Sequence, residues 1–166
     1  VDDGWRVAMT LLGFERGETA ATMPIRFQAE LDRLLALAAE RGVADDPIVR
    51  QRLAWAHSQV QIMRYSGMRV LTQFLRGHHP GPDAAISKLF WSEYHQEAME
   101  LAMDVLGMAG QILTGDPDKY ESVPGYGRRK PSPDYPASAL QSSYFFSRCE
   151  TIWGGSAEIQ RNIVGE

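Results

Sequence analysis

The first pattern that could do chemistry lies in residues 152–162, IWGGSAEIQRN. Gly154 and Gly155 are adjacent, and paired glycines leave backbone N–H groups uncovered because no side chain shields them. Ser156 then begins a new helical pattern and is a suitable N-cap for it. N–H groups at such a corner, with the helix N-terminus behind them, would face a phosphate or a carbonyl oxygen. The alternative is a tight corner between two helices that binds nothing.

A carboxylate on an apolar helix face is the second candidate. Glu15 lies three, four and seven residues after Leu12, Leu11 and Ala8, so it shares their helical face. A carboxylate among apolar side chains is costly unless it is paired or used, which makes Glu15 a candidate general base. The alternative is that residues 15–18, ERGE, form a solvated polar patch.

Histidine and cysteine do not form a metal or nucleophile motif. His78 and His79 are adjacent and have no carboxylate at ligand spacing, so we expect a solvated turn and no metal site. His57 and His95 stand alone in predicted helices, where a partnered core or boundary position is expected. Cys149 is the single cysteine and cannot form an internal disulfide, which favours a reducing compartment and a cytoplasmic location.

Most of the chain has apolar residues at helical spacing. Helices are predicted over residues 5–41, 47–76, 82–106 and 137–151, with a short one from Ser156. Pro24 must kink or split the first helix, and Asp46 caps the second. Residues 108–136 are rich in proline and glycine and predict a long loop. We therefore predict an all-α fold, an antiparallel up-down four-helix bundle with a short extra C-terminal helix and a long loop before the fourth helix.

Length and charge exclude some classes of function. The 166 residues carry a formal net charge of −4 and offer no basic surface to a nucleic acid. The longest apolar runs are far shorter than the roughly 20 residues of a membrane span. The length fits one domain with a sizeable core. Because Val1 is not a start methionine and Glu166 falls within a helical pattern, we expect residues 1–166 to be a piece of a longer protein.

Several segments together resemble the C-terminal helical domain of the acyl-CoA dehydrogenase family. The most specific is residues 154–162, GGSAEIQRN, which matches a strong tag of that family. FERG at residues 14–17, Lys88 in the third helix and LGMAG at residues 106–110 agree with it in the same order along the chain. The resemblance covers nearly all of residues 1–166. It implies one C-terminal domain, with the family's N-terminal helical and middle β-domains absent here.

This resemblance implies an FAD-dependent oxidoreductase that introduces a double bond between the α and β carbons of an acyl-CoA thioester, as in fatty acid β-oxidation. A glutamate takes the α-proton while a hydride leaves for the flavin. Many members carry that glutamate where this chain has Gly154. In the branch that resembles isovaleryl-CoA and long-chain dehydrogenases it lies in the first helix before an arginine, as Glu15 precedes Arg16. Glu15 is therefore the implied base, and the Gly154 N–H the implied donor to the thioester carbonyl.

The resemblance also implies binding residues and partners. The implied FAD contacts are Trp153, Gly155, Ser156, Glu158, Gly107 and Gly110, and the implied substrate contacts are Arg16 and Trp153. An electron-transfer flavoprotein or similar acceptor, and a homo- or hetero-oligomer (dimer or tetramer), are expected. Residues 1–166 alone are expected to be inactive, because half a site cannot hold the flavin ring or exclude water.

Two departures from the family pattern keep a second reading open. The stretch between the first two helices has no Arg-x-Phe-Gly segment, and the glycine-rich segment after the third helix is thinned to residues 107–110. Both segments serve flavin binding in many members. The alternative is therefore a non-catalytic structural subunit of a hetero-oligomeric acyl-CoA dehydrogenase.

Overall fold

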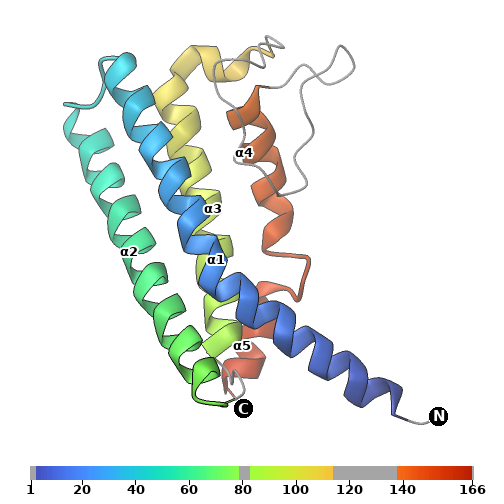
Figure 1. Ribbon diagram of the computed structural model, residues 1–166. Coiled ribbons are helices and arrows are strands. Elements are labelled where there is room, and N and C mark those ends of the chain that lie inside the picture. Colours follow the sequence, from blue (N-terminus) through green and yellow to red (C-terminus); the bar gives the residue numbers. More distant parts are fainter. Residues whose placement is uncertain (1–2, 79–82, 114–137, 166) are drawn as a thin grey trace.

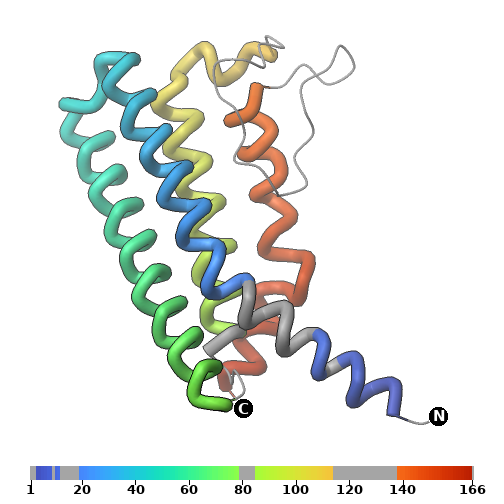
Figure 2. The backbone as a smooth tube through the Cα atoms, viewed as in Figure 1, coloured from blue at the N-terminus to red at the C-terminus, as the bar shows by residue number. Residues whose placement is uncertain are grey.

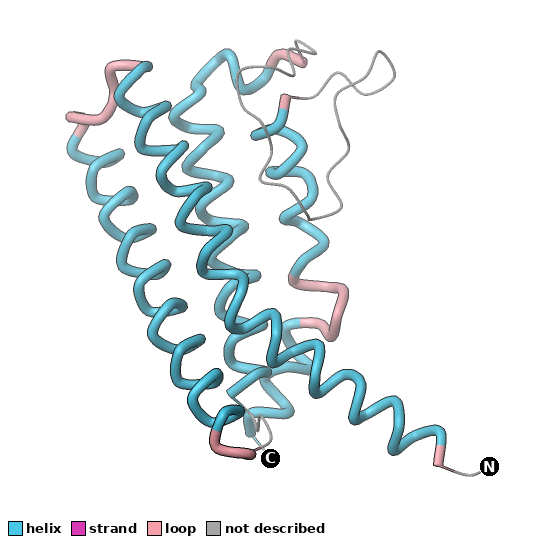
Figure 3. The backbone as a smooth tube through the Cα atoms, viewed as in Figure 1, coloured by secondary structure: helices cyan, strands magenta, loops and turns pink. Residues whose placement is uncertain are grey.

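The computed structural model describes residues 3–78, 83–113 and 138–165, and within its helices the side chains of residues 9, 12–18, 83 and 84 lie outside the description. The described residues form helices and loops without a strand (Figure 3), which confirms the all-α prediction. The elements are α1 (Gly4–Glu40), α2 (Pro47–Leu75), α3 (Asp83–Leu106), the short 3-10 helix η1 (Gly107–Gln111), α4 (Ala139–Glu150) and α5 (Ala157–Gly165).

The helix α3 is the centre of the fold. It packs against α1, α2, α4 and α5, and η1 continues it. Figure 1 shows α1 to α4 running in alternating directions, with the short α5 beside the N-terminal end of α3. Since α4 and α5 pack mainly on α3, this one helix positions the side chains of α4 and α5 and the loop between them.

Pro24 bends α1 without splitting it. The helix is continuous over 37 residues with the proline inside. A proline lacks the N–H for one helical hydrogen bond, and its ring crowds the preceding turn, so a helix kinks there. Figures 1 and 2 show that α1 changes direction near its middle and that its N-terminal half points away from the bundle. Of the two predicted outcomes, a kinked or a split helix, the structure shows the kink.

The ends of the first two helices follow local signals in the sequence. Asp46 Oδ1 accepts the N–H groups of Ile48 and Val49 at 2.9 and 3.1 Å and so caps α2. The glycine after α1, Gly42, has φ +70°, and the glycine after α2, Gly77, has φ +77°. Both glycines adopt the left-handed conformation that ends helices.

Two boundaries near the fourth helix differ from the prediction. The stretch predicted as a loop begins with η1, and residues 114–137 lie outside the described residues. The helix α4 starts at Ala139, because Ser138 caps it in a reciprocal pair with Gln141. Ser138 N–H donates to Gln141 Oε1 at 2.8 Å, and Gln141 N–H donates to Ser138 Oγ at 3.3 Å.

The core lies where α1, α2 and α3 meet. The apolar spacing of α2 predicts that Met68 is buried with Leu53, Ala56, Val60 and Met63, but Met68 is 48% exposed. Its neighbour Gly67 is buried instead, and a Cβ there would lie 2.5 Å from the carbonyl oxygen of Ala20. The two helices thus touch backbone to backbone at Gly67, which turns Met68 outward.

Candidate functional site

The glycine corner, residues 151–156, joins α4 to α5. Gly154 has φ +61° and Gly155 φ +91°, conformations that other residues rarely adopt. The Ala157 N–H donates to the Thr151 carbonyl at 2.9 Å and closes the corner. No described residue accepts a hydrogen bond from the N–H of Gly154 or Gly155. Two adjacent backbone donors are therefore open to an acceptor.

The buried side chain of Gln160 lies directly against the second glycine of the corner. A Cβ at Gly155 would lie 2.3 Å from Gln160 Nε2. That amide group donates to the carbonyls of Gly154 and Gly155 at 3.2 and 3.5 Å. At Gly154 a Cβ would meet only Lys88 Cε, at 4.0 Å. The positive φ favours glycine at both positions, and at 155 a side chain would also displace the buried amide of Gln160.

Lys88 of α3 supports the corner from beneath. Its side chain is 8% exposed, and its Nζ donates to the carbonyls of Glu150 and Gly155, both at 2.7 Å. Burial lowers the pKa of Lys88, while the carboxylates of Glu150 and Glu158 act in the opposite direction. A buried ammonium group thus binds the end of α4 to the second glycine.

A buried carboxylate–imidazole–carboxylate cluster lies on the same helix face. His95 Nδ1 is 2.5 Å from Glu150 Oε2, and its Nε2 is 3.1 Å from Glu30 Oε2. Although burial alone lowers the pKa of His95, the carboxylates of Glu30 and Glu150 raise it to about 9. The cluster joins α1, α3 and α4 and confirms the expectation that His95 is a partnered core residue. The same expectation for His57 is wrong, because its side chain is exposed.

The outer rim of the corner is aromatic and acidic. Trp153 is 45% exposed and packs edge-on against Phe146, with ring centroids 5.2 Å apart. Ser156 Oγ accepts the Ile159 N–H at 3.4 Å, as predicted for the cap of α5. The pKa of exposed Glu158 is lowered, first by its own backbone N–H and then by Ser156. The corner therefore presents a flat ring, open N–H groups and an ionised carboxylate to whatever covers it.

The structure separates the corner from two of the predicted cofactor contacts. Gly107 and Gly110 lie in η1, at the far end of α3 from Lys88. The 19 residues from Lys88 to Gly107 correspond to about 28 Å along a helix. The carbonyl of Gly110 accepts Gln141 Nε2 at 2.8 Å, so this glycine holds the start of α4. The predicted cofactor contacts therefore lie at both ends of α3.

Glu15 and Arg16 lie in the projecting half of α1. Their backbone is helical, and their side chains are outside the described residues. Their assignment as base and substrate contact stays a prediction.

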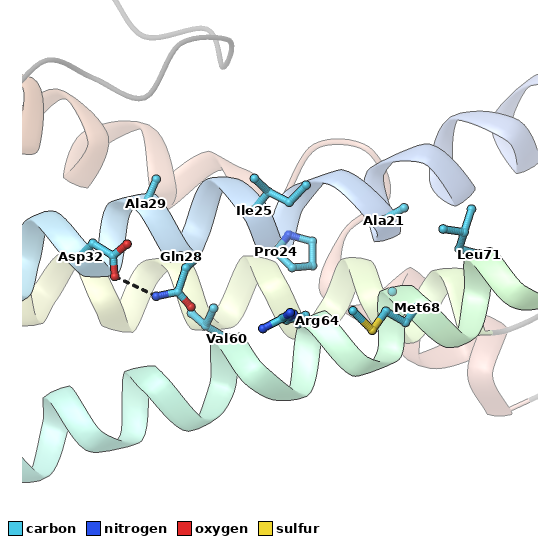
Figure 4. A pocket seen from close by; sticks show the side chains of 11 residues that line it. Ala21, Pro24, Ile25, Gln28, Ala29, Asp32, Val60, Arg64, Met68 and Leu71 are labelled. Carbon is cyan, nitrogen blue, oxygen red and sulfur yellow. Dashed lines mark hydrogen bonds between the residues drawn. The ribbon is translucent and has the colours of Figure 1, made fainter.

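A groove between α1 and α2 is a second open feature (Figure 4). Its volume is about 600 Å³, and its wall is mainly apolar. Gln28 Nε2 donates to Asp32 Oδ1 at 2.8 Å on one side, and Arg64 lies on the other. The lining residues are Ala21, Pro24, Ile25, Gln28, Ala29, Asp32, Val60, Arg64, Gly67, Met68 and Leu71. No predicted site residue lines the groove.

Two features are absent from the described residues. No group of His, Cys, Asp and Glu there could hold a metal ion. None of the described helices is long and apolar enough to cross a membrane.

Sequence reasoning missed the support beneath the corner. The family resemblance includes Lys88 but implies no role for it, and it includes neither Glu30 nor Glu150. A signal for Glu30 was present, because it lies three residues after Phe27 and four before Leu34 on an apolar face. That spacing is the argument that singled out Glu15.

Comparison with known proteins agrees with the resemblance. Residues 2–166 match the family model described as acyl-CoA dehydrogenase, C-terminal domain. The chain is 40% identical over 165 residues to acyl-CoA dehydrogenase IpdE1 of Mycolicibacterium smegmatis, covering 99% of this chain and 36% of that protein. It is 38% identical over 164 residues to the IpdE1 of Mycobacterium tuberculosis, covering 99% and 37%. The chain thus spans little more than a third of these relatives.

Solved structures share the fold. The Tcur3481-Tcur3483 steroid ACAD, an acyl-CoA dehydrogenase, superposes with a TM-score of 0.76 at 24% identity, over 99% of this chain and 39% of that one. The ChsE4-ChsE5 complex from Mycobacterium tuberculosis gives 0.62 at 20% identity, over 86% and 34%.

Proposed function

Because this chain belongs to the acyl-CoA dehydrogenase family, whose C-terminal domain it contains, we propose that it is the C-terminal part of a longer FAD-dependent enzyme that forms an α,β double bond in an acyl-CoA thioester. The proposed intact enzyme adds an N-terminal helical domain and a middle β-domain, which together provide the other walls of the site. The matched relatives, of which this chain covers little more than a third, support this division.

The glycine corner is the observation that carries the proposal. A thioester carbonyl gains negative charge as its α-proton leaves, and preorganised N–H donors stabilise that charge. Gly154 is exposed, its N–H has no acceptor among the described residues, and it belongs to a corner fixed by Lys88 and Gln160. Loss of one such donor typically costs about 2.7–4 kcal/mol in other enzymes. We assign the Gly154 N–H this role.

Glu15 is the proposed base. A glutamate at position 154 would serve in many relatives, and glycine there leaves that place without a carboxylate. Glu15 lies on an apolar stripe of α1 and precedes Arg16, which we assign to substrate binding. A base in a dry site is where a carboxylate among apolar side chains is useful, because weak solvation favours proton abstraction.

The residues at the rim fit one face of FAD, which supplies the hydride acceptor when bound. The exposed ring of Trp153 suits a flat ring system, and Gly155 and Ser156 offer polar backbone and hydroxyl groups beside it. Glu158 stays ionised, so it would repel a diphosphate and suits the hydroxyl groups of the adenosine portion better. Gly107 and Gly110, about 28 Å away along α3, would contact the flavin of another subunit.

A second candidate function is a non-catalytic subunit of a mixed dehydrogenase complex. Two of the solved structures with this fold are named as complexes of two chains. The missing Arg-x-Phe-Gly segment between α1 and α2 favours this candidate, since it removes one family contact to FAD.

Another subunit is expected to cover the α1–α2 groove and the outer face of α2. Large apolar side chains are exposed along that face: Ile62, Tyr65, Met68, Leu71, Phe74 and Leu75. Exposed apolar patches of this kind mark association surfaces. Light scattering is expected to give a dimer or tetramer for the parent and a smaller species for Met68→Glu combined with Leu71→Glu. A monomeric parent would contradict this assignment.

The function is tested on the purified intact protein by two measurements. The amount of FAD per chain comes first, and anaerobic mixing with a panel of acyl-CoA thioesters follows. We expect one FAD per chain and loss of flavin absorbance with at least one thioester, then reoxidation by an electron-transfer flavoprotein or similar acceptor. Bound FAD that no thioester reduces would contradict the reaction, and a chain without FAD would favour the non-catalytic subunit.

A further inference from the structure

We propose that Lys88 is a positioning residue for the reaction: its ammonium group fixes the glycine corner so that the Gly154 N–H is held in place before substrate arrives. This inference rests on the proposed function, in which that N–H stabilises the thioester oxygen. It assigns the effect to a side chain on α3 that does not itself touch the substrate.

The ammonium group closes the segment that contains both glycines. Lys88 Nζ is 2.7 Å from the carbonyl oxygen of Glu150 and 2.7 Å from that of Gly155. The chain between these two oxygens, residues 151–155, therefore begins and ends at one positive charge. Within the same segment, Gln160 Nε2 donates a hydrogen bond to the carbonyl of Gly154 at 3.2 Å. The carbonyls of both glycines are thus bound, while their N–H groups stay open.

The corner needs such a restraint because of its composition. Glycine has the largest backbone freedom of any residue, and here two occur in succession with positive φ. Fixing the backbone of a residue costs conformational entropy, and glycine loses more of it than any other residue. A donor stabilises developing charge fully only when it is already oriented, so a mobile corner would lose part of its effect at the moment of reaction.

Lys88 is itself held firmly. Its Cε lies 4.0 Å from where a Cβ of Gly154 would stand, so its stem packs directly beneath that glycine. Seven residues later on α3, His95 binds the side chain of Glu150, whose carbonyl Lys88 also holds. Glu30 binds His95 from the other side. The negative charges of Glu30 and Glu150 are therefore balanced by protonated Lys88 and His95, and all four side chains are 8% exposed or less.

An ion pair between α3 and α5 provides the matched control. Arg161 Nη2 of α5 is 2.5 Å from Glu93 Oε1 of α3, and both side chains are about half exposed. This pair ties α3 to the helix that follows the corner, whereas Lys88 ties α3 to the end of α4 and to the corner itself. A role limited to holding α5 on the bundle would be shared by both ties.

The test compares Lys88→Met with Arg161→Gln in the intact enzyme, using two readouts. The first is the flavin-reduction rate in rapid mixing, with kcat and KM determined separately. The second is the infrared stretching frequency of the labelled thioester carbonyl in a bound acyl-CoA without hydrogen on its β-carbon, which cannot be oxidised. Methionine keeps the length of the stem and removes the charge.

We expect Lys88→Met to lower the reduction rate about 10–100-fold with little change in KM, because the donor remains but is no longer fixed. The carbonyl frequency should move toward its value in water. Lys88→Arg should keep more of the parent frequency than Met, and Arg161→Gln should keep all of it. A parent enzyme that does not shift the carbonyl would refute the proposed function instead.

The positioning role is overturned if the parent shifts the carbonyl and Lys88→Met shifts it equally. If Lys88→Met does not assemble with FAD, Lys88→Gln takes its place with the same expected direction. Failure of both to assemble also overturns the proposal, since Lys88 would then hold the bundle together rather than the corner.

Discussion

The buried His95 links the stability of the fold to pH. Its ordinary pKa is 6.5, and in the fold, where it lies between Glu30 and Glu150, it rises to about 9. The folded state therefore binds this proton more tightly than the unfolded chain does. The resulting stabilisation is complete below pH 6.5 and is lost as the pH rises through 9.

The size of this effect follows from the difference between the two values. At about 1.36 kcal/mol for each pH unit, the rise from 6.5 to about 9 corresponds to roughly 3 kcal/mol. Solvent screening reduces it little, because His95 and Glu150 are each 1% exposed. Two other groups near the cluster affect the pH dependence of stability in another pH range or with the opposite sign. Burial raises the pKa of Tyr94 far above this range, and the lowered pKa of Lys88 favours unfolding at low pH.

Urea unfolding across this pH range measures the effect. We expect the free energy of unfolding to fall by roughly 3 kcal/mol between pH 6.5 and a pH above 9. In His95→Gln this loss should be much smaller, and at pH 6.5 the variant should be about 3–5 kcal/mol less stable, because two buried carboxylates lose their partner. His57→Gln, at an exposed histidine, is the matched control and should behave as the parent. An unchanged pH dependence in His95→Gln would refute the reasoning.

Two further predictions concern helix contacts and caps. Gly67→Ala should destabilise the fold by about 1–3 kcal/mol despite a gain in helix propensity of at most about 1, because the new Cβ would lie 2.5 Å from the Ala20 carbonyl. Ser66→Ala, on the exposed side of the same turn, should be neutral or slightly stabilising in the same urea assay. Ser138→Ala should cost about 1 kcal/mol in thermal unfolding through loss of the α4 cap, and an unchanged melting temperature would contradict that role.

Local signals in the sequence predicted the helices well. Asp46 followed by Pro47, and Gly42 after a helical pattern, act within a few residues, so the ends of α1 and α2 could be predicted. The choice between Gly67 and Met68 could not, because it depends on where α1 crosses α2. Spacing within one helix carries no information about that crossing point.

In the candidate site, too, local features could be predicted from the sequence and contacts between distant residues could not. Paired glycines indicated a corner with uncovered backbone N–H groups, but they did not indicate that Gln160, five residues later in the same motif, packs against Gly155. The bond from Lys88 to Glu150 joins residues 62 apart in the chain, so no periodic pattern marks it. Such pairs become visible only when α3 and α4 are packed together.

The central claim is that Glu15 removes the α-proton while the Gly154 N–H stabilises the thioester oxygen. The most direct measurement is the rate of flavin reduction by acyl-CoA in Glu15→Gln of the intact enzyme, with Glu18→Gln as the neighbouring control. We predict a loss of about 10²–10⁴-fold with FAD still bound, since this is the usual contribution of a general base. Adding Gly154→Glu should restore part of the rate by placing a carboxylate at the family's other position. Reduction of Glu15→Gln at the parent rate would contradict the account.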